Sequence, residues 1–141
     1  MADTFQLQIA TAERLMVDEQ VTQAEIPGKE GYMGILAGHA PLLSALGAGV
    51  LTYEGGGRGQ ETLAIAGGFL EVFQDHVSVL ADHAEFAADI QADKARQELE
   101  QANDALKKAQ NESESDAALK TVQRAQARID ASQRASGGAH Q

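Results

Sequence analysis

The chain has 141 residues, a formal net charge of -10 and no cysteine. This length suits one small domain with an extension, and the lack of cysteine excludes a disulfide framework and a thiolate metal site. The negative charge argues against a nucleic-acid binder and against direct docking on anionic lipid, since both need clustered Lys and Arg, so we expect protein partners.

The first segment, MADTFQLQIATAERL, has neither a basic start followed by an apolar run nor an Arg-rich amphipathic pattern. We therefore expect neither a secretory signal nor a transit peptide. No apolar run approaches the roughly 20 residues that span a bilayer, so we expect any membrane association to go through a partner. Phe5, Leu7 and Ile9 alternate with polar or small residues, which predicts a strand buried on one face.

Two β-hairpins follow in the next part of the chain. Val50–Tyr53 and Thr62–Ile65 flank the glycine-rich sequence EGGGRGQ, whose glycines readily take the positive φ of tight connections. Leu70–Phe73 and Val77–Leu80 flank a very short turn at Asp75. Repeated short strands of this kind favour an antiparallel sandwich or barrel over a parallel sheet.

From about Glu85 to Arg134 the composition changes to Ala, Gln, Lys, Arg, Asp and Glu, which favours helix. Apolar residues recur at spacings of three and four on one face of two helices. They are Ala95, Leu99, Ala102, Leu106 and Ala109 in the first, and Ala118, Val122, Ala125, Ile129 and Ser132 in the second. The break NESES, residues 111–115, offers Ser115 as a cap. So short a break predicts an antiparallel hairpin, whose alanines bury little area.

The sequence thus predicts a β + α fold, an N-terminal antiparallel β-sandwich followed by a C-terminal antiparallel two-helix hairpin. We assign residues 1–86 to a sandwich that docks on partners and residues 87–134 to a regulatory hairpin. Residues 135–141 are expected to be a disordered tail, because SGGAHQ has neither apolar period nor helix-forming composition.

The second helix carries a basic stripe formed by Lys120, Arg124 and Arg128. At about 100° per residue, this stripe lies roughly 120° from the apolar face of the same helix. We therefore expect it to face outward when the hairpin is closed. Two interpretations stay open: a solvated helix face, or a surface that meets acidic groups on a partner protein.

A metal site or an active site has weak support. His39, His76, His83 and His140 include no H-x-H pair and have no compact ligand spacing. No Ser/His/Asp or paired-carboxylate pattern stands out, and Gly55–Gly59 lack the following G-K-[ST] of a phosphate-binding loop. We predict no cofactor. The alternative that stays open is a cupin-like or ligand-binding sandwich with an oligomerising hairpin.

Two stretches carry a family resemblance. IPGKEGYMGILAGHAPLLSALGAGVL, residues 26–51, and GGFLEVFQDHVSVLADHAE, residues 67–85, resemble the signature of the epsilon subunit of bacterial F-type ATP synthases. The resemblance implies a non-catalytic central-stalk subunit at the cytoplasmic face of the bacterial plasma membrane. Such a subunit links gamma to the ring of c subunits and couples proton flow to ATP synthesis. It also implies that the helices extend toward the alpha and beta subunits and inhibit ATP hydrolysis.

The resemblance also assigns contact residues. The implied c-ring contact comprises Gly28, Lys29, Glu30, Gly31, Tyr32 and Met33. The implied gamma contact comprises His39, Ala40, Pro41, Leu42 and Leu43. Many relatives have an acidic residue where this chain has Tyr32, so we expect neighbouring Glu30 to meet a cationic loop of the ring.

Some bacterial relatives bind ATP through an I-D-x-x-R-A motif at the start of the first helix. In this chain Gln91 replaces the carboxylate and Lys94 replaces the guanidinium, while Asp93 adds negative charge. These changes exchange a charged acceptor for an amide and a bidentate fork for a point charge. The sequence therefore predicts weak or absent ATP binding.

Overall fold

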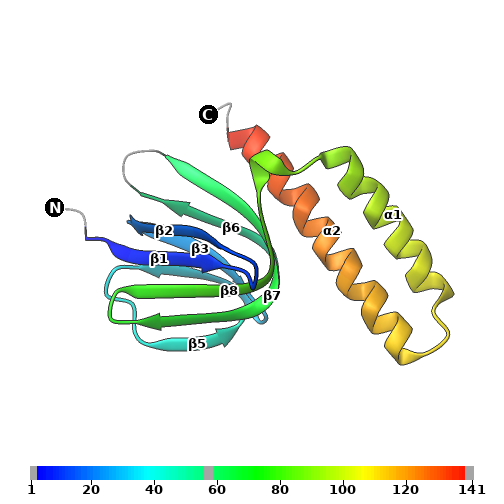
Figure 1. Ribbon diagram of the computed structural model, residues 1–141, viewed down its shortest axis with the longest axis horizontal. Coiled ribbons are helices and arrows are strands. Elements are labelled where there is room, and N and C mark those ends of the chain that lie inside the picture. Colours follow the sequence, from blue (N-terminus) through cyan, green and yellow to red (C-terminus); the bar gives the residue numbers. More distant parts are fainter. Residues whose placement is uncertain (1–2, 56–58, 139–141) are drawn as a thin grey trace.

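The computed structural model describes residues 3–55 and 59–138, with side chains up to residue 135. Within these ranges a β-sandwich precedes two α-helices (Figure 1). The strands are β1 (Phe5–Ala10), β2 (Leu15–Val21), β3 (Gln23–Gly28), β4 (Gly31–Leu36), β5 (Leu42–Ala45), β6 (Ala48–Glu54), β7 (Gln60–Phe73) and β8 (His76–Phe86). The helices are the 3-10 turn η1 (Ala87–Asp89), α1 (Ala92–Lys108) and α2 (Glu112–Gly138).

The strands form one continuous sheet in the order β2-β1-β8-β7-β6-β3-β4, with β5 paired to β7. Most neighbours are antiparallel, and β1 pairs with β8 in parallel. Gly67 and Gly68 take φ values of 73° and 116° inside β7. At these two glycines β7 bends together with β8, so that the sheet folds over into two layers (Figure 1). The predicted sandwich is confirmed. Thr62–Ile65 and Leu70–Phe73, predicted as separate strands of two hairpins, are both part of the one strand β7.

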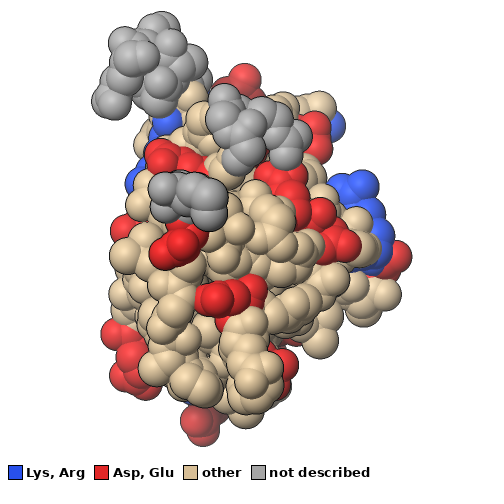
Figure 2. Space-filling model, turned by 90° about the vertical axis from the view of Figure 1, so that its left-hand side faces the viewer, with Lys and Arg blue, Asp and Glu red and all other residues tan. Residues whose placement is uncertain are grey.

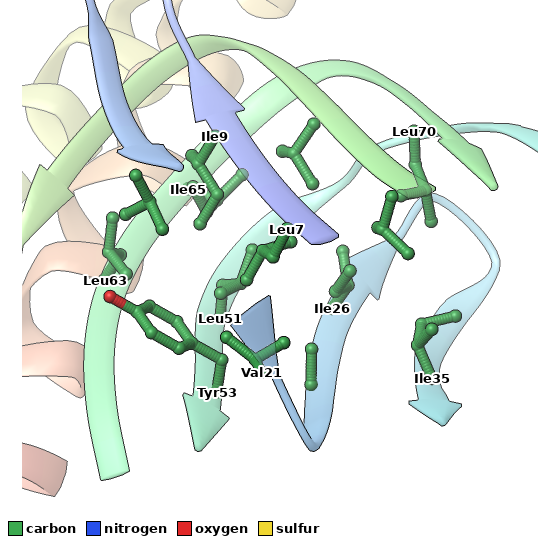
Figure 3. Packing of buried hydrophobic residues seen from close by; sticks show 14 of the residues in the cluster. Leu7, Ile9, Val21, Ile26, Ile35, Leu51, Tyr53, Leu63, Ile65 and Leu70 are labelled. Atoms are coloured by element: carbon green, nitrogen blue, oxygen red, sulfur yellow. The ribbon is translucent and has the colours of Figure 1, made fainter. Parts of the chain in front are cut away.

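The core lies between the two layers of the sandwich. Figure 3 shows Leu7, Ile26 and Leu51, from β1, β3 and β6, converging on this space. The predicted alternation holds, since Phe5, Leu7 and Ile9 are at most 1% exposed. Because apolar side chains fill the interior, the alternative of a ligand-binding pocket within the sandwich finds no support in the described residues.

The helices form the predicted antiparallel hairpin, joined by only three residues, Ala109 to Asn111. The cap of α2 differs from the prediction. The side-chain oxygen of Asn111 accepts a hydrogen bond from the Glu114 N–H at 2.8 Å, and the Glu114 carboxylate accepts one from the Gln110 N–H at 3.0 Å. Asn111 is therefore the cap, and Ser115 lies inside the first turns of α2.

Helix α2 lies between the sandwich and α1 (Figure 1). Ala127 and Ala131 pack with Val50 and Ala64 on the outer face of β6 and β7. Ala125 lies about 200° from Ala127 around the helix axis, on the side away from the sandwich. It is also fully buried, and α1 is the element that packs on that side. Both sides of α2 are therefore covered, whereas the sequence indicated one.

Helix α2 also ends later than predicted. It runs to Gly138 rather than to Arg134, so residues 135–138 of the expected disordered tail are helical. Arg134 sits close to the sandwich, with its guanidinium 3.7 Å from the Glu25 carboxylate of β3. The last part of the expected tail, residues 139–141, lies outside the described residues.

Candidate interaction surfaces

The segment assigned to the c ring, residues 28–33, forms the turn between β3 and β4. Lys29 and Glu30 are exposed at its tip. The backbone N–H of Lys29 donates to the Ala45 carbonyl at 2.9 Å, which ties the turn to the end of β5. The structure thus presents one cation and one carboxylate on a turn that is held in place.

Tyr32 lies on the same turn but has a local role. Its hydroxyl accepts a hydrogen bond from the Val50 N–H at 3.0 Å, and the residue as a whole remains 54% exposed. A Cβ at Gly49 would lie 2.5 Å from that hydroxyl oxygen. Glycine at position 49 therefore leaves room for the tyrosine to lie across β6, and Glu30 is the carboxylate at the tip.

The segment assigned to gamma, residues 39–43, begins in the loop after β4 and continues into β5. The Gly38 N–H donates to an Asp75 carboxylate oxygen at 2.6 Å, which places this loop beside the turn between β7 and β8. The c-ring segment adjoins the other end of β5, at Ala45 and Leu46. The two implied contacts therefore lie at opposite ends of one short strand.

An apolar patch, which the sequence analysis did not single out, continues from this loop along the outer face of the sheet. We define it by four side chains that are 54% to 72% exposed: Leu43, Phe69, Phe73 and Leu80. Phe69 and Leu80 are direct cross-strand partners on β7 and β8, and Leu43 of β5 lies opposite Glu71. Large apolar side chains grouped in this way on a surface indicate a protein-binding site.

Charge is distributed unevenly around the sandwich. Figure 2 shows the end of the molecule opposite the helices, where uncharged surface is interspersed with Asp and Glu, and Lys and Arg lie at the margins. A partner that docks at this end meets uncharged and acidic groups. A partner surface that combines uncharged area with Lys or Arg side chains would complement this end of the molecule.

The predicted outward orientation of the basic stripe is wrong for Arg128. Its guanidinium makes two hydrogen bonds to the Glu85 carboxylate of β8, at 3.0 and 3.2 Å. The same guanidinium lies 3.7 Å from Glu98 of α1. Arg128 is therefore held between the sandwich and both helices.

The orientation is wrong for Arg124 as well and correct for Lys120. Arg124 lies 3.4 Å from Glu98 and 3.3 Å from the His83 ring, whereas Lys120 is exposed. The reason is that α2 packs on two roughly opposite sides, α1 on one and the sandwich on the other, and the stripe lies between them, next to the alanines that meet the sandwich. A groove of about 400 Å³ runs beside these groups, between α2 and the turn that carries Glu13.

The residues that replace the nucleotide motif lie at the start of α1. Gln91 is the residue before its first turn, and Lys94 is exposed. Asp93 forms an exposed ion pair with Arg96 at 3.1 Å. The acidic side chain that was expected to repel phosphate is thus partly neutralised by a neighbour, and weak or absent ATP binding stays a prediction.

The histidines do not converge. His39 hydrogen bonds to the Ala40 carbonyl and His76 to the Gln8 side chain, while His83 contacts Arg124. Within residues 3–55 and 59–138, no group of three His, Asp or Glu side chains is placed to hold a metal ion; His140 lies outside them. Among the described helices, none combines the length and apolar character needed to cross a bilayer.

Comparison with known proteins shows which family the chain resembles. Residues 4–87 match the family model described as ATP synthase, Delta/Epsilon chain, beta-sandwich domain. The chain is 47% identical over 130 residues to the ATP synthase epsilon chain of Solibacter usitatus, covering 92% of this chain and 96% of that one. It is 40% identical over 114 residues to the epsilon chain of Rhodospirillum rubrum, covering 81% and 85%.

Solved structures support the same fold. A chain of the Euglena gracilis mitochondrial ATP synthase, in an OSCP/F1/c-ring structure, superposes with a TM-score of 0.76 at 24% identity. That match covers 94% of this chain and 81% of the other. At so low an identity it shows the shared fold, in which a sandwich is followed by helices.

Proposed function

The chain belongs to the ATP synthase epsilon-chain family, and we propose that it is the central-stalk subunit that joins gamma to the c ring. In this role it is a non-catalytic part of the enzyme and couples proton flow to ATP synthesis. Residues 1–86 form the docking domain and residues 87–134 the regulatory hairpin. The proposed location is the cytoplasmic face of a bacterial plasma membrane, where the subunit is held by its partners.

The apolar patch is the observation that carries this proposal. β7 is covered by α2 at Ala64 but bears the exposed side chains of Phe69 and Phe73 beyond its bend. The patch adjoins the loop of residues 39–43, so the loop and the patch form one continuous docking face for gamma. Lys29 and Glu30, at the other end of β5, remain available to the polar loops of the ring.

The inhibitory role is proposed for the open form of the hairpin. In the closed form Arg124 and Arg128 are engaged with carboxylates of the same chain, while Lys120 is exposed. A guanidinium group that is paired with a carboxylate of its own chain cannot use the same N–H groups to bind a second carboxylate. Opening would therefore make both guanidinium groups available to acidic groups on a catalytic subunit. Hydrolysis is then suppressed when the hairpin is extended.

The docking proposal is tested by adding this subunit to an ATP synthase complex that lacks it. Changing Phe69 or Leu43 to Asp should weaken binding by at least about thirtyfold, the loss typical of a central interface residue. Leu119→Asp is the matched control, because Leu119 is an exposed leucine on α2, away from the patch. Equal affinities for all three variants would contradict the docking face.

The inhibitory proposal is tested by ATP hydrolysis in the assembled enzyme. The triple variant Lys120→Ala, Arg124→Ala and Arg128→Ala should relieve suppression. The control replaces Lys107 and Lys108, two exposed cations in the last turn of α1, and should leave suppression unchanged. Suppression that survives in the triple variant would exclude the basic stripe as the inhibitory contact.

A further inference from the structure

Two carboxylates converge on the two arginines of α2. Glu85 at the end of β8 and Glu98 of α1 belong to different elements, yet both reach Arg128. Glu98 also pairs with Arg124 at 3.4 Å. These side chains are between 21% and 34% exposed, so their interactions are screened less than those of fully exposed pairs.

The position of Glu98 is unusual for a carboxylate. Its Oε1 atom is buried, faces the Arg128 guanidinium at 3.7 Å, and has no hydrogen-bond partner within the described part of the chain. A buried carboxylate oxygen loses its water, and a nearby cation is then needed to offset that loss. Glu98 therefore depends on the two arginines, and this dependence holds α1 to α2 where α2 meets the sandwich.

The apolar part of the same contact is small. The described side chains that pack α2 on the sandwich are mainly alanines, together with Val50 and Ile90. Methyl groups remove little apolar area from water when they are buried. The ion pairs therefore contribute a large share of the free-energy difference between the closed and the open hairpin.

We propose that Glu85 and Glu98 form a carboxylate latch that keeps the hairpin closed by holding Arg124 and Arg128 against the sandwich. Opening separates these groups, and any acidic surface that binds the same arginines competes with the latch. The inference concerns the isolated chain and holds whether or not the proposed function is correct.

The test uses the chain of 141 residues, which has no cysteine to remove. Spin labels are attached at Glu61→Cys on β7 and Gln123→Cys on α2, both exposed positions, and the distance distribution gives the closed and open populations. Glu85→Gln and Glu98→Gln, which keep shape but remove charge, should each raise the open-to-closed ratio about tenfold, the effect of one charge-assisted hydrogen bond.

Asp93→Asn is the matched control, because it removes an exposed ion pair within α1 that joins no other element. Raising the salt concentration from about 0.01 M to about 1 M lowers the Debye length from about 30 Å to about 3 Å. It should open the parent chain more than a chain that carries both Glu85→Gln and Glu98→Gln. If Glu85→Gln destabilises the sandwich in urea, Glu98→Gln, which lies outside it, decides the question. Unchanged distances in Glu98→Gln at every salt concentration would overturn the latch.

Discussion

The sandwich and the hairpin are stabilised in different ways. The sandwich buries large side chains such as Leu7, Ile26 and Leu51 between its layers, and each contributes about 1.5–3 kcal/mol. The hairpin docks through alanines such as Ala127 and Ala131, whose methyl groups contribute about 0.8 kcal/mol each. Its remaining attachment comes from ion pairs that salt weakens.

This difference indicates which part of the molecule can leave its packing surface and bind another protein. A core of fully buried aliphatic side chains cannot open without global unfolding, whereas a small apolar contact with ion pairs can separate at modest cost. The proposed docking face lies on the stable part, at Phe69 and Leu80. The arginines that the inhibitory proposal requires lie on the hairpin, the part that we expect to open.

The largest effect on stability is expected from truncating a side chain in the core of the sandwich. Leu51→Ala should lower the free energy of unfolding by about 2–5 kcal/mol, because it leaves a cavity among fully buried side chains. Urea unfolding followed by circular dichroism measures this change. Leu36→Ala, at a position 61% exposed on β4, should change stability by no more than about 0.5 kcal/mol. Equal losses in the two variants would argue against the assigned core.

An intermediate effect is expected where α2 meets the sandwich. Ala131 is fully buried against Val50 and Ala64, so Ala131→Leu should overfill the contact and weaken docking by about 1–3 kcal/mol. The methyl resonances of Val50 and Ala64 should shift toward solvent-exposed values while the core resonances stay unchanged. Gln133→Leu, at an exposed position, is the control. Shifts spread through the whole sandwich would contradict separate docking.

The smallest effect sharpens the assignment of the turn between the helices. Asn111→Ala should destabilise the first turn of α2 by about 1 kcal/mol, because its side chain caps the Glu114 N–H. Amide hydrogen exchange at Glu114 should accelerate. Ser115→Ala, at the residue that the sequence indicated as the cap, should have little effect on that amide. The reverse order of effects would restore the sequence-based assignment.

Local patterns in the sequence were sufficient for much of the fold. The alternation of Phe5, Leu7 and Ile9 predicted their burial in β1, and spacings of three and four predicted both helices. The parallel pairing of β1 with β8 was not predictable in this way, because it joins residues about 70 positions apart along the chain. Periodicity reports which face of an element is buried and does not name the neighbour.

The candidate surfaces show the same limit. The position of Arg128 follows from the fact that α2 packs on two sides, whereas the apolar spacing of the sequence indicated one. The second side was not recognised because the alanines that meet the sandwich alternate with cationic residues along the helix. A signal for the apolar patch was available: Phe69, Leu70, Val72 and Phe73 put apolar side chains on both faces of one strand. A strand that is apolar on both faces needs a second covering layer, and here the described chain covers one face.

The most direct test of the central claim is amide hydrogen exchange on the isolated chain at low and high salt. We expect β1, β6, β7 and β8 to exchange through global unfolding, and α1 and α2 to exchange earlier, through an opening that salt makes more frequent. Helices protected as strongly as the strands, at both salt concentrations, would show that the hairpin is a fixed part of the sandwich and would contradict the account.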